Sequence, residues 1–510
     1  MKKNSLTTAV VAGIAGVAGF AGLANAVHLN PDGIGQVLLY PYYTVNNNQQ
    51  TLLSVVNTTS VAKAVKVRFL EGYNSREVLD FNLFLSRYDV WTATIFALSD
   101  DGQTGDGAAI LTRDKSCTAP LFSEDGTNTS GGTPYVAFRD FAYLTPDDGG
   151  PGTIDRTREG HFGIISMADL SGALATAVTH SGANQTPPNC GAVRSLQGNE
   201  TGIDAPTSGL FGGAGVINGG QGTYFAYNAD ALDRFTFQNI FTATGSIFPN
   251  LAFVNDGVGP LSLQATANVF TGTGVTTSTY PGPNPLSDQV DAVTAIFTAN
   301  NIYNEYQTST ALGAGSDWVV TFPTKAFYVD ELYIGSGNPA IAPFTRVYDG
   351  SPGASPQFSC VAVGLSIYDQ EEKTTTGSLP GFSPPPPGAP PSSLCKETNV
   401  ISFLNVNVAP TQSGVLGSRL VTNVKPAVGA AGWLRLDLNP AIEPHAVLAA
   451  TNGNVFRGLP VTGFWATNVI NANATVINGV STLGNYSGVF NHRRSRNCTN
   501  INNTVAQGCS

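Results

Sequence analysis

Alternation of apolar and polar side chains at every second position is the feature that most constrains how this chain folds. Near its start, Val65, Val67 and Phe69 alternate with Lys66 and Arg68. This period of two is that of a β-strand with one apolar and one polar face. Similar strand patterns lie close by, before it in segment 52–57 and after it in segments 78–85 and 89–95. Together they predict a sheet-rich module, and the turn-forming residues 57–60 predict that its first two strands form a hairpin.

Charged residues are concentrated in this module, although Asp, Glu, Lys and Arg make up only 12% of the whole chain. Segment 67–95 contains Arg68, Glu71, Arg76, Glu77, Asp80, Arg87 and Asp89. On the strand assignment, most of them lie on an outward face or in turns. We therefore interpret them as cross-strand ion pairs that stabilise a scaffold, and the alternative is a carboxylate site.

A related pattern occurs a second time farther along the chain. Residues 53–57 align with 251–255 at an offset of 198, and 91–95 align with 318–322 at an offset of 227. The 29 additional residues of the second copy include the best helical pattern in the chain, near 287–307, with Ser287 as the expected N-cap. We therefore expect a mainly β chain with tandem antiparallel β-sandwich domains of Ig-like type, the second with a short helical insertion.

Segments of biased composition divide the chain. The glycine-rich segment 210–222 predicts a hinge or tight turn at a domain boundary, which gives a first domain of residues 27–220 and a second of residues 221–491. The proline-rich segment 376–393 predicts an exposed polyproline loop. Residues 492–510, which begin with the basic stretch 492–496, predict a solvated C-terminal tail.

Residues 1–26 have the three parts of a secretory signal peptide. Lys2 and Lys3 form the positive start, residues 9–23 form an apolar core, and residues 24–26 form an A-x-A cleavage site. We expect the mature chain to begin at Val27 and to be secreted or exposed at the cell surface. A membrane anchor is the competing interpretation, but no basic flank follows the apolar run. No later segment reaches the ~20 apolar residues of a spanning helix.

Removal of the signal leaves 23 basic and 35 acidic residues, a net charge of −12. An acidic surface repels nucleic acid and anionic lipid, so neither is expected as a partner. The low charged fraction and the 57 glycines are typical of a β-rich extracellular chain with a neutral polar surface. An envelope polymer, a glycan or other surface proteins are the expected partners.

Six cysteines in an exported chain predict disulfides rather than metal ligands, because the chain has no C-x-x-C pair. Pairing of nearest neighbours joins Cys117 to Cys190, Cys360 to Cys395, and Cys498 to Cys509. Sequence alone leaves about 15 pairings open.

Metal binding has one candidate segment, 100–107, in which Asp100, Asp101 and Asp106 offer carboxylates to calcium. The segment lacks the spacing of an EF-hand loop, so an acidic surface loop without metal is favoured, and no other cofactor is expected. The five histidines lie in no hydrolase or zinc-protease motif. No residue is assigned a catalytic role, but the candidate carboxylates for a glycosidase are Glu71, Asp80, Asp369, Glu371 and Glu372.

Four segments of the chain resemble motifs of a known family. They are GQVLLYPYYTV (35–45), DWVVTFPTKAFYVD (317–330), SLCKETNVISF (393–403) and VFNHRRSR (489–496). They are similar to a proteobacterial family of exported proteins described as "cell surface protein". The resemblance implies a location in the envelope or outside the cell, and it implies no activity.

Three classes of function follow from these observations. The favoured one is an exported structural or adhesive protein of the cell surface without catalytic activity. The second is an extracellular carbohydrate-active enzyme that uses paired carboxylates. The third is an outer-membrane β-barrel, which the terminal Ser510 and the dispersed cysteines disfavour.

Overall fold

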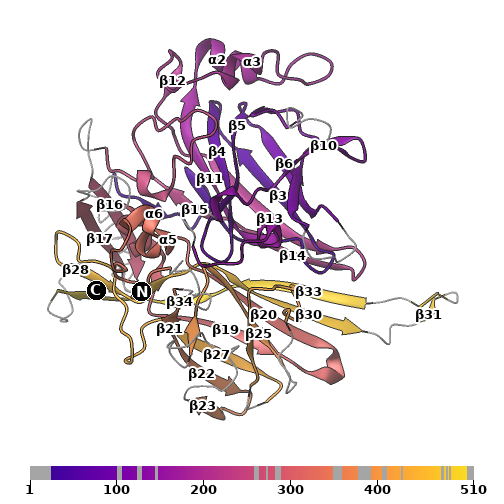
Figure 1. The fold of residues 1–510 in the computed structure, drawn as a ribbon, viewed down its shortest axis with the longest axis vertical. Helices are drawn as coiled ribbons and strands as arrows, with labels where there is room; N and C mark the ends of the chain where they lie inside the picture. Colours follow the sequence, from indigo (N-terminus) through magenta and orange to yellow (C-terminus); the bar gives the residue numbers. More distant parts are fainter. Residues whose placement is uncertain are drawn as a thin grey trace, which may run out of the picture.

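Strands dominate the part of the chain that the computed structural model describes, and most of them pair in antiparallel sheets (Figure 1). The chain is therefore mainly β, as predicted. The described residues are 25–99, 106–122, 129–143, 148–257, 264–271, 274–281, 289–348, 359–376, 392–404, 411–426, 429–471, 476–477, 480–481 and 484–501.

Two large sheets form the N-terminal part of the molecule. Sheet I has the order β1 (His28–Leu29), β15 (Asp230–Asp233), β2 (Val37–Thr44), β11 (Glu159–Leu170), β4 (Ala62–Glu71), β5 (Glu77–Leu85) and β8 (Cys117–Ala119), and β12 (Ile203–Asp204) also pairs with β11. Sheet II has the order β14 (Thr223–Asn228), β13 (Leu210–Asn218), β3 (Gln50–Asn57), β6 (Val90–Ala97), β7 (Ala108–Leu111), β10 (Thr133–Ala137) and β9 (Thr129–Ser130).

Sheets I and II enclose a shared apolar core, and we call this pair the first sandwich. Tyr40 stacks on Phe162 within sheet I at 4.1 Å between ring centroids, and Phe81 of sheet I meets Trp91 of sheet II at 5.8 Å. The four strands predicted between residues 52 and 95 are confirmed as β3, β4, β5 and β6. The predicted hairpin of the first two is wrong, because β3 pairs with β6 and β13 whereas β4 pairs with β5 and β11.

The glycine-rich segment is a strand rather than a hinge. Leu210–Asn218 forms β13 in sheet II, between β14 and β3. Glycine is required at Gly212, where a Cβ atom would collide with the Tyr40 hydroxyl inside the sandwich. Since β14 and β15 also pair within sheets II and I, the first sandwich continues past residue 220 to Asp233.

Two smaller sheets form the second sandwich. Sheet III has the order β23 (Thr374–Thr376), β22 (Gly364–Asp369), β27 (Ala431–Asp437), β19 (Asn301–Gln307) and β34 (Arg493–Ser495). Sheet IV has the order β26 (Val421–Val424), β25 (Thr398–Phe403), β20 (Ala314–Thr321), β30 (Phe464–Asn471) and β33 (Gly484–Asn491), with β26 parallel to β25. Phe403 of sheet IV packs between Trp318 at 5.6 Å and Tyr306 of sheet III at 5.3 Å.

Short elements fill the space around these sheets. The paired short strands are β16 (Gln264–Thr271) with β17 (Gly274–Pro281), β18 (Thr298–Ala299) with β29 (Leu459–Pro460), β21 (Val361–Ala362) with β24 (Ser393–Leu394), β28 (Asn454–Arg457) with β35 (Asn497–Asn500), and β31 (Val476–Ile477) with β32 (Val480–Ser481). The helices are α2 (Gly172–Val178), α3 (Gly191–Arg194), α4 (Val290–Phe297), α5 (Ala326–Val329) and α6 (Glu331–Ile334), and the 3-10 turns are η1 (Phe141–Tyr143), η2 (Ile154–Arg158), η3 (Leu251–Phe253) and η4 (Thr310–Leu312). None of the helices in the described ranges is both long and apolar enough to cross a membrane.

The predicted second copy of the strand pattern holds only in part. Trp91 and Trp318 both lie in strands, but Leu251–Phe253 forms η3. The predicted helix is confirmed only over Val290–Phe297, because residues 298–307 form β18 and β19. All eight residues of α4 are buried, so the helix lies inside the fold rather than on its surface. The expected cap, Ser287, lies outside the described residues.

The part of the predicted solvated tail that the structure describes, residues 492–501, is packed into the fold. His492 is buried, β34 pairs with β19, and β35 pairs with β28. Arg496 donates hydrogen bonds to the carbonyl oxygens of Ile296 (3.0 Å) and Thr298 (3.2 Å) at the C-terminal end of α4. A cation at that end of a helix is favourable because the free carbonyls carry partial negative charge. The basic stretch is therefore structural.

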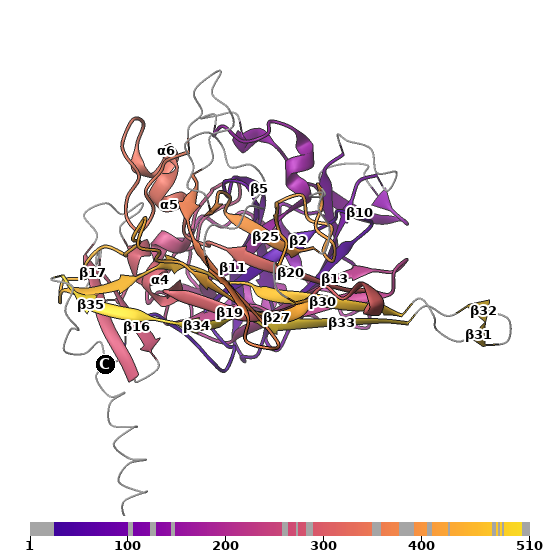
Figure 2. The ribbon, with the colours of Figure 1, turned by 90° about the horizontal axis from the view of Figure 1, so that it is seen from below.

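The two sandwiches are joined along sheet IV (Figures 1 and 2). The backbone N–H groups of Glu397 and Thr398 donate to the carbonyl oxygens of Tyr73 and Gly72, at 2.8 and 2.9 Å. A Cβ atom on Gly72 would collide with the Leu420 side chain, so glycine permits this close approach. In both views the β30–β33 hairpin extends from the body toward β31 and β32.

Candidate functional site

The charges of the opening strands are paired as predicted, but Lys66 and Arg68 are buried and their acidic partners are half-buried. Lys66 Nζ lies 3.1 Å from Asp80 Oδ1, and Arg68 Nη2 lies 2.7 Å from Glu77 Oε2, so the cross-strand ion pairs are confirmed. The predicted outward face is wrong, because the Lys66 side chain has no exposed surface. Its ammonium group also donates to the carbonyl oxygen of Ser246, in the segment that covers this face of sheet I.

Glu77 is the most perturbed carboxyl of these strands. Burial raises its pKa to about 7, against the opposing charge of Arg68 and with a further increase from Asp80. A carboxyl of this kind is a candidate for acid–base chemistry. Here it is held in an ion pair, and its side chain is only 16% exposed.

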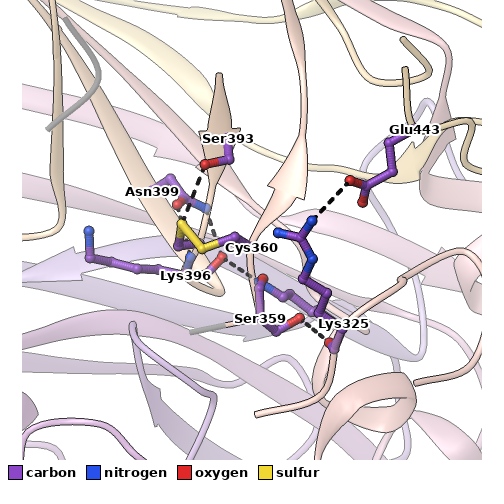
Figure 3. The surroundings of a disulfide bond; sticks show 9 residues. Lys325, Ser359, Cys360, Ser393, Lys396, Asn399 and Glu443 are labelled. Carbon is purple, nitrogen blue, oxygen red and sulfur yellow. Dashed lines mark hydrogen bonds and ion pairs between the residues drawn. A yellow bond between two sulfur atoms is a disulfide. The ribbon is translucent and has the colours of Figure 1, made fainter. Parts of the chain in front are cut away.

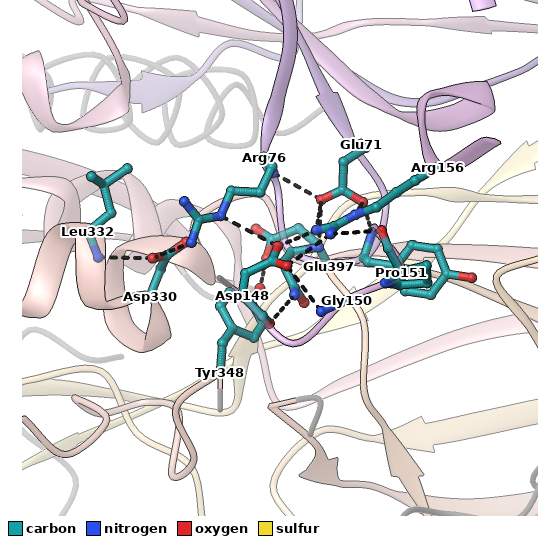
Figure 4. Close-up of polar contacts among 12 residues, drawn as sticks. Glu71, Arg76, Asp148, Gly150, Pro151, Arg156, Asp330, Leu332, Tyr348 and Glu397 are labelled. Atoms are coloured by element: carbon teal, nitrogen blue, oxygen red, sulfur yellow. Dashed lines mark hydrogen bonds and ion pairs between the residues drawn. The ribbon is translucent and has the colours of Figure 1, made fainter. Parts of the chain in front are cut away.

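A second set of charges lies where the two sandwiches meet, and Figure 4 shows it. We call this set the junction cluster; it consists of Glu71, Arg76, Asp148, Arg156 and Asp330. β4 supplies the first residue, η2 supplies Arg156, and the start of α6 supplies Asp330. The cluster thus connects segments that lie far apart in the sequence.

Arg156 is at the centre of the junction cluster. Its Nε and Nη2 atoms lie 2.7 and 2.8 Å from the two carboxylate oxygens of Glu71, and Nη1 donates to Asp148 Oδ1 at 2.9 Å. The guanidinium also lies 4.3 Å from the ring centroid of Tyr143. Although burial opposes the charge, the two carboxylates raise the pKa of Arg156. Its donors are directed at carboxylates, and its side chain has no exposed surface.

The carboxylates of the junction cluster also accept hydrogen bonds from backbone N–H groups. Glu71 accepts the backbone N–H groups of Tyr73, Asn74 and Arg76 at 2.7, 2.9 and 3.0 Å. Arg76 bridges to Asp330, whose carboxylate also accepts the N–H of Leu332 and so caps α6. A carboxylate with this many donors is fixed in one position. The geometry is that of a structural ion-pair network.

Lys325 and Glu397 form a buried pair beside the junction cluster. Burial lowers the pKa of Lys325 to about 7 and raises the pKa of Glu397 to about 7, while each charge partly offsets the effect on its partner. Lys325 Nζ donates to the carbonyl oxygens of Ser359 (2.6 Å) and Lys396 (3.3 Å), beside the Cys360–Cys395 disulfide (Figure 3). Tyr348 donates to Glu397 at 3.0 Å. Neither charged side chain is exposed.

Glu159 links the two sandwiches a second time. Its carboxylate, at the start of β11, accepts hydrogen bonds from the Ser418 hydroxyl (2.7 Å) and from the N–H groups of Arg419 (2.7 Å) and Leu420 (3.1 Å). Tyr42 of the first sandwich donates to it at 3.0 Å. Burial raises the pKa of Glu159 even so. Both carboxylate oxygens of Glu159 are therefore hydrogen-bonded to residues 418–420 of the second sandwich.

The remaining carboxylate candidates lie apart from these sites. Asp369 ends β22 and accepts the N–H groups of Glu371 (3.0 Å) and Lys373 (2.8 Å), which closes a turn. Glu371 and Glu372 are exposed in that turn. Asp80 and Glu71 belong to the two charge clusters described above.

The calcium segment is described only at its end. Asp100 and Asp101 lie outside the described residues, and the carboxylate of Asp106 accepts a hydrogen bond from the Ser99 hydroxyl. Across the ranges that are described, no group of three His, Cys, Asp or Glu side chains is placed to hold a metal ion. The calcium site stays a prediction.

Two of the expected disulfides are formed. Cys117 is bonded to Cys190 and Cys360 to Cys395, as nearest-neighbour pairing predicts. Cys509 lies outside the described residues, so its pairing with Cys498 stays a prediction. The same holds for most of the proline-rich loop, since residues 377–391 are not described.

Sequence reasoning missed an open groove of about 780 Å³ on the outer face of sheet II. Its floor is low because β13 carries Gly213 and Gly215, and β14 places Ala226 opposite Gly215. The Tyr224 side chain covers the Gly215 end of this floor. The signal was present in the sequence as glycines at alternate positions, which leave one face of a strand without side chains. The glycines were interpreted as a hinge instead.

Comparison of the chain with protein-family models, with curated proteins and with solved structures finds no match.

Proposed function

We propose that the protein is an exported structural or adhesive protein of the cell surface, built from two tandem sandwiches of Ig-like type. The observation that carries the proposal is the pair of disulfides, Cys117–Cys190 and Cys360–Cys395, in a mainly β chain. Disulfides persist in oxidising compartments outside the cytosol. The signal peptide expected over residues 1–26 and the four segments that resemble exported "cell surface" proteins support the same location.

The use of charge in the molecule supports a structural role. Two of the carboxylates singled out from the sequence, the buried Glu71 and the half-buried Asp80, are held in ion pairs within the fold. Glu159 and the junction cluster connect the two sandwiches through charge-assisted hydrogen bonds. Charge-assisted hydrogen bonds between buried groups are strong and directional, so they fix how the two sandwiches sit against each other.

Protease treatment of intact producing cells tests the location. We expect an added protease to cleave the native protein on intact cells, unless the protein is already released into the medium. We also expect the mature chain to begin at Val27. A cytosolic marker protein should stay uncut in the same cells. A full-length, uncut chain that fractionates with the cytosolic marker and carries reduced cysteines would overturn the proposal.

A further inference from the structure

We propose that the groove on the outer face of sheet II binds a neutral polysaccharide chain. The proposal rests on the cell-surface location proposed above and adds to it a ligand class and the residues that bind it. Four observations on the described residues support it: the shape of the floor, one exposed aromatic ring, a set of uncharged polar side chains, and the sheet ladder beneath them.

The floor of the groove is made where β13 and β14 carry small residues on this face, namely Gly213, Gly215 and Ala226. In the register of sheet II, Gly213 lies opposite Ser54, and Gly215 lies between Leu52 and Ala226. The small residues form a trough across β13 and β14, next to the larger side chains of β3. Its volume of about 780 Å³ falls within the ~300–1,000 Å³ typical of ligand sites. The trough is open, which suits a segment of a long chain rather than an enclosed small molecule.

Tyr224 provides a flat apolar platform at the side of this floor. The ring lies over Gly215: its Cζ and Oη atoms are 2.7 and 2.8 Å from the point where a Cβ atom on Gly215 would stand. Glycine is therefore needed beneath this edge of the ring. Tyr224 is 53% exposed, so much of its ring is open to solvent. Sugar rings present apolar C–H faces that stack on aromatic rings of this kind.

Uncharged hydrogen-bonding groups line the rest of the groove. They are the side chains of Ser54, Thr92, Thr94, Thr112 and Asn228. Hydroxyl and amide groups can donate and accept, as sugar hydroxyls also do. Thr112 uses its hydroxyl to bond the Thr92 carbonyl oxygen at 2.6 Å. Within the described chain, the side chains of Thr92, Thr94 and Asn228 make no hydrogen bond, so they are available to a ligand.

The charge of the groove favours a neutral polymer over an acidic one. Among the described residues that line it, Arg113 is the one charged side chain. Its Nε atom donates to the Thr133 hydroxyl at 3.2 Å. The whole chain carries a net charge of −10, which repels an acidic polymer, and one exposed arginine does not reverse that field.

A peptide strand is a poorer occupant of the same face. The backbone groups of β13, β3 and β6 are already used in the ladders of sheet II. An extended peptide gains its affinity by adding to a free sheet edge, where such groups are unpaired. The face of the sheet offers only side chains, and here these are a ring and neutral polar groups. A chain of stacked, hydroxyl-rich rings matches that surface.

Affinity electrophoresis of the purified full-length chain tests the proposal. The gels contain one neutral polysaccharide each: a β-1,4-glucan, a β-1,3-glucan, a galactomannan or an arabinoxylan. Alginate and polygalacturonate serve as acidic polymers. We expect retardation in at least one neutral gel, and we expect 0.5 M NaCl to leave it unchanged.

Two variants address the groove in different ways. Tyr224→Ala removes the platform, and Ala226→Trp fills the trough without removing any contact. Each should weaken the retardation, which corresponds to a rise in the apparent Kd of roughly tenfold or more. Tyr88→Ala is the matched control, because Tyr88 is 68% exposed on the same sandwich and does not line the groove. It should behave as the wild type. Circular dichroism verifies that all three variants fold.

The proposal is overturned if the wild type is retarded by no neutral polysaccharide, or only by the acidic polymers in a salt-sensitive way. Retardation that both groove variants keep at wild-type strength would also overturn it. These results would leave the cell-surface location standing, because protease treatment of intact cells measures that location independently of any ligand.

Discussion

The junction cluster and the groove differ in burial, in charge and in how far their polar side chains are hydrogen-bonded. The junction cluster contains five charged side chains, all buried or nearly so and all bonded to one another or to the backbone. The groove is exposed, has one charged residue in its lining, and carries polar side chains without partners. Charged side chains hold the junction together, whereas small side chains on one face of β13 and β14 leave room for the groove.

The difference has an energetic basis. A buried charge is tolerated only when ion pairs and hydrogen bonds replace its lost hydration, so its position is strictly determined. An exposed groove with a single charged side chain imposes few constraints on the fold, so its residues can contact a ligand. Substitutions in the two regions should therefore separate stability from binding.

The largest expected effect is that of removing Arg156. Arg156→Met leaves Glu71 and Asp148 without their main counter-ion in the interior. We expect the free energy of unfolding, measured by urea denaturation, to fall by about 3–5 kcal/mol. Arg113→Met is the matched control on the exposed groove, where we expect a change within about 0.5 kcal/mol. Equal effects of the two variants would contradict the contrast between the regions.

The disulfide beside the junction should rank second. Cys360 and Cys395 are 35 residues apart, and their bond restricts the unfolded chain. Replacing both with serine should lower the free energy of unfolding by about 2–4 kcal/mol. Reduction of the wild type should shift its melting temperature in the same direction. A double variant as stable as the oxidised wild type would show that the bond adds nothing to the junction.

A smaller effect should appear as a dependence on pH. His161 of β11 is buried, with Nδ1 3.4 Å from the Thr398 hydroxyl of the second sandwich. Burial, and then the charge of Arg68, lowers its pKa to about 3. Since an unfolded histidine binds a proton near pH 6.5, the folded state is penalised as pH falls from about 6.5 toward 3.

Substitution of His161 isolates this contribution from that of the buried carboxyls. Relative to His161→Gln, the wild type should lose up to ~1.4 kcal/mol of unfolding free energy for each pH unit between about 6 and 4. Urea titrations of both proteins at several pH values measure the difference. Parallel pH profiles for the two proteins would show that His161 is protonated in the folded state.

The smallest expected effect on stability is at the groove. Tyr224→Ala removes an exposed ring, so we expect the free energy of unfolding to change by no more than about 0.5 kcal/mol. The same variant should lose polysaccharide binding. A loss of stability as large as that of Arg156→Met would make the ring a structural element rather than a platform for a ligand.

The strands of the first sandwich could be predicted because their apolar positions recur with a period of two. The pairing of these strands could not, since β3 and β4 belong to different sheets although only a short turn separates them. Likewise, the sequence showed that Lys66 alternates with apolar residues, but not that a later segment around Ser246 covers it. Both outcomes depend on contacts between residues far apart in the chain.

The candidate sites were less predictable than the strands. Acidic residues such as Asp369 and Glu71 are equally visible in a sequence whether they bind a substrate or a backbone N–H group. The partner decides the role, and the partner is fixed by tertiary structure. Gly213 and Gly215 show the converse. Glycines on one face of a strand form a groove only when a neighbouring strand, here β14, is paired beside them, and the sequence does not show that pairing.

Hydrogen–deuterium exchange through a urea titration tests most directly that the charged junction makes one unit of the two sandwiches. We predict that amides of β4 and β11 in the first sandwich and of β20 and β25 in the second lose protection at the same urea concentration. In Arg156→Met, that common midpoint should shift downward. Loss of protection in the two sandwiches at clearly separate urea concentrations in the wild type would contradict the account.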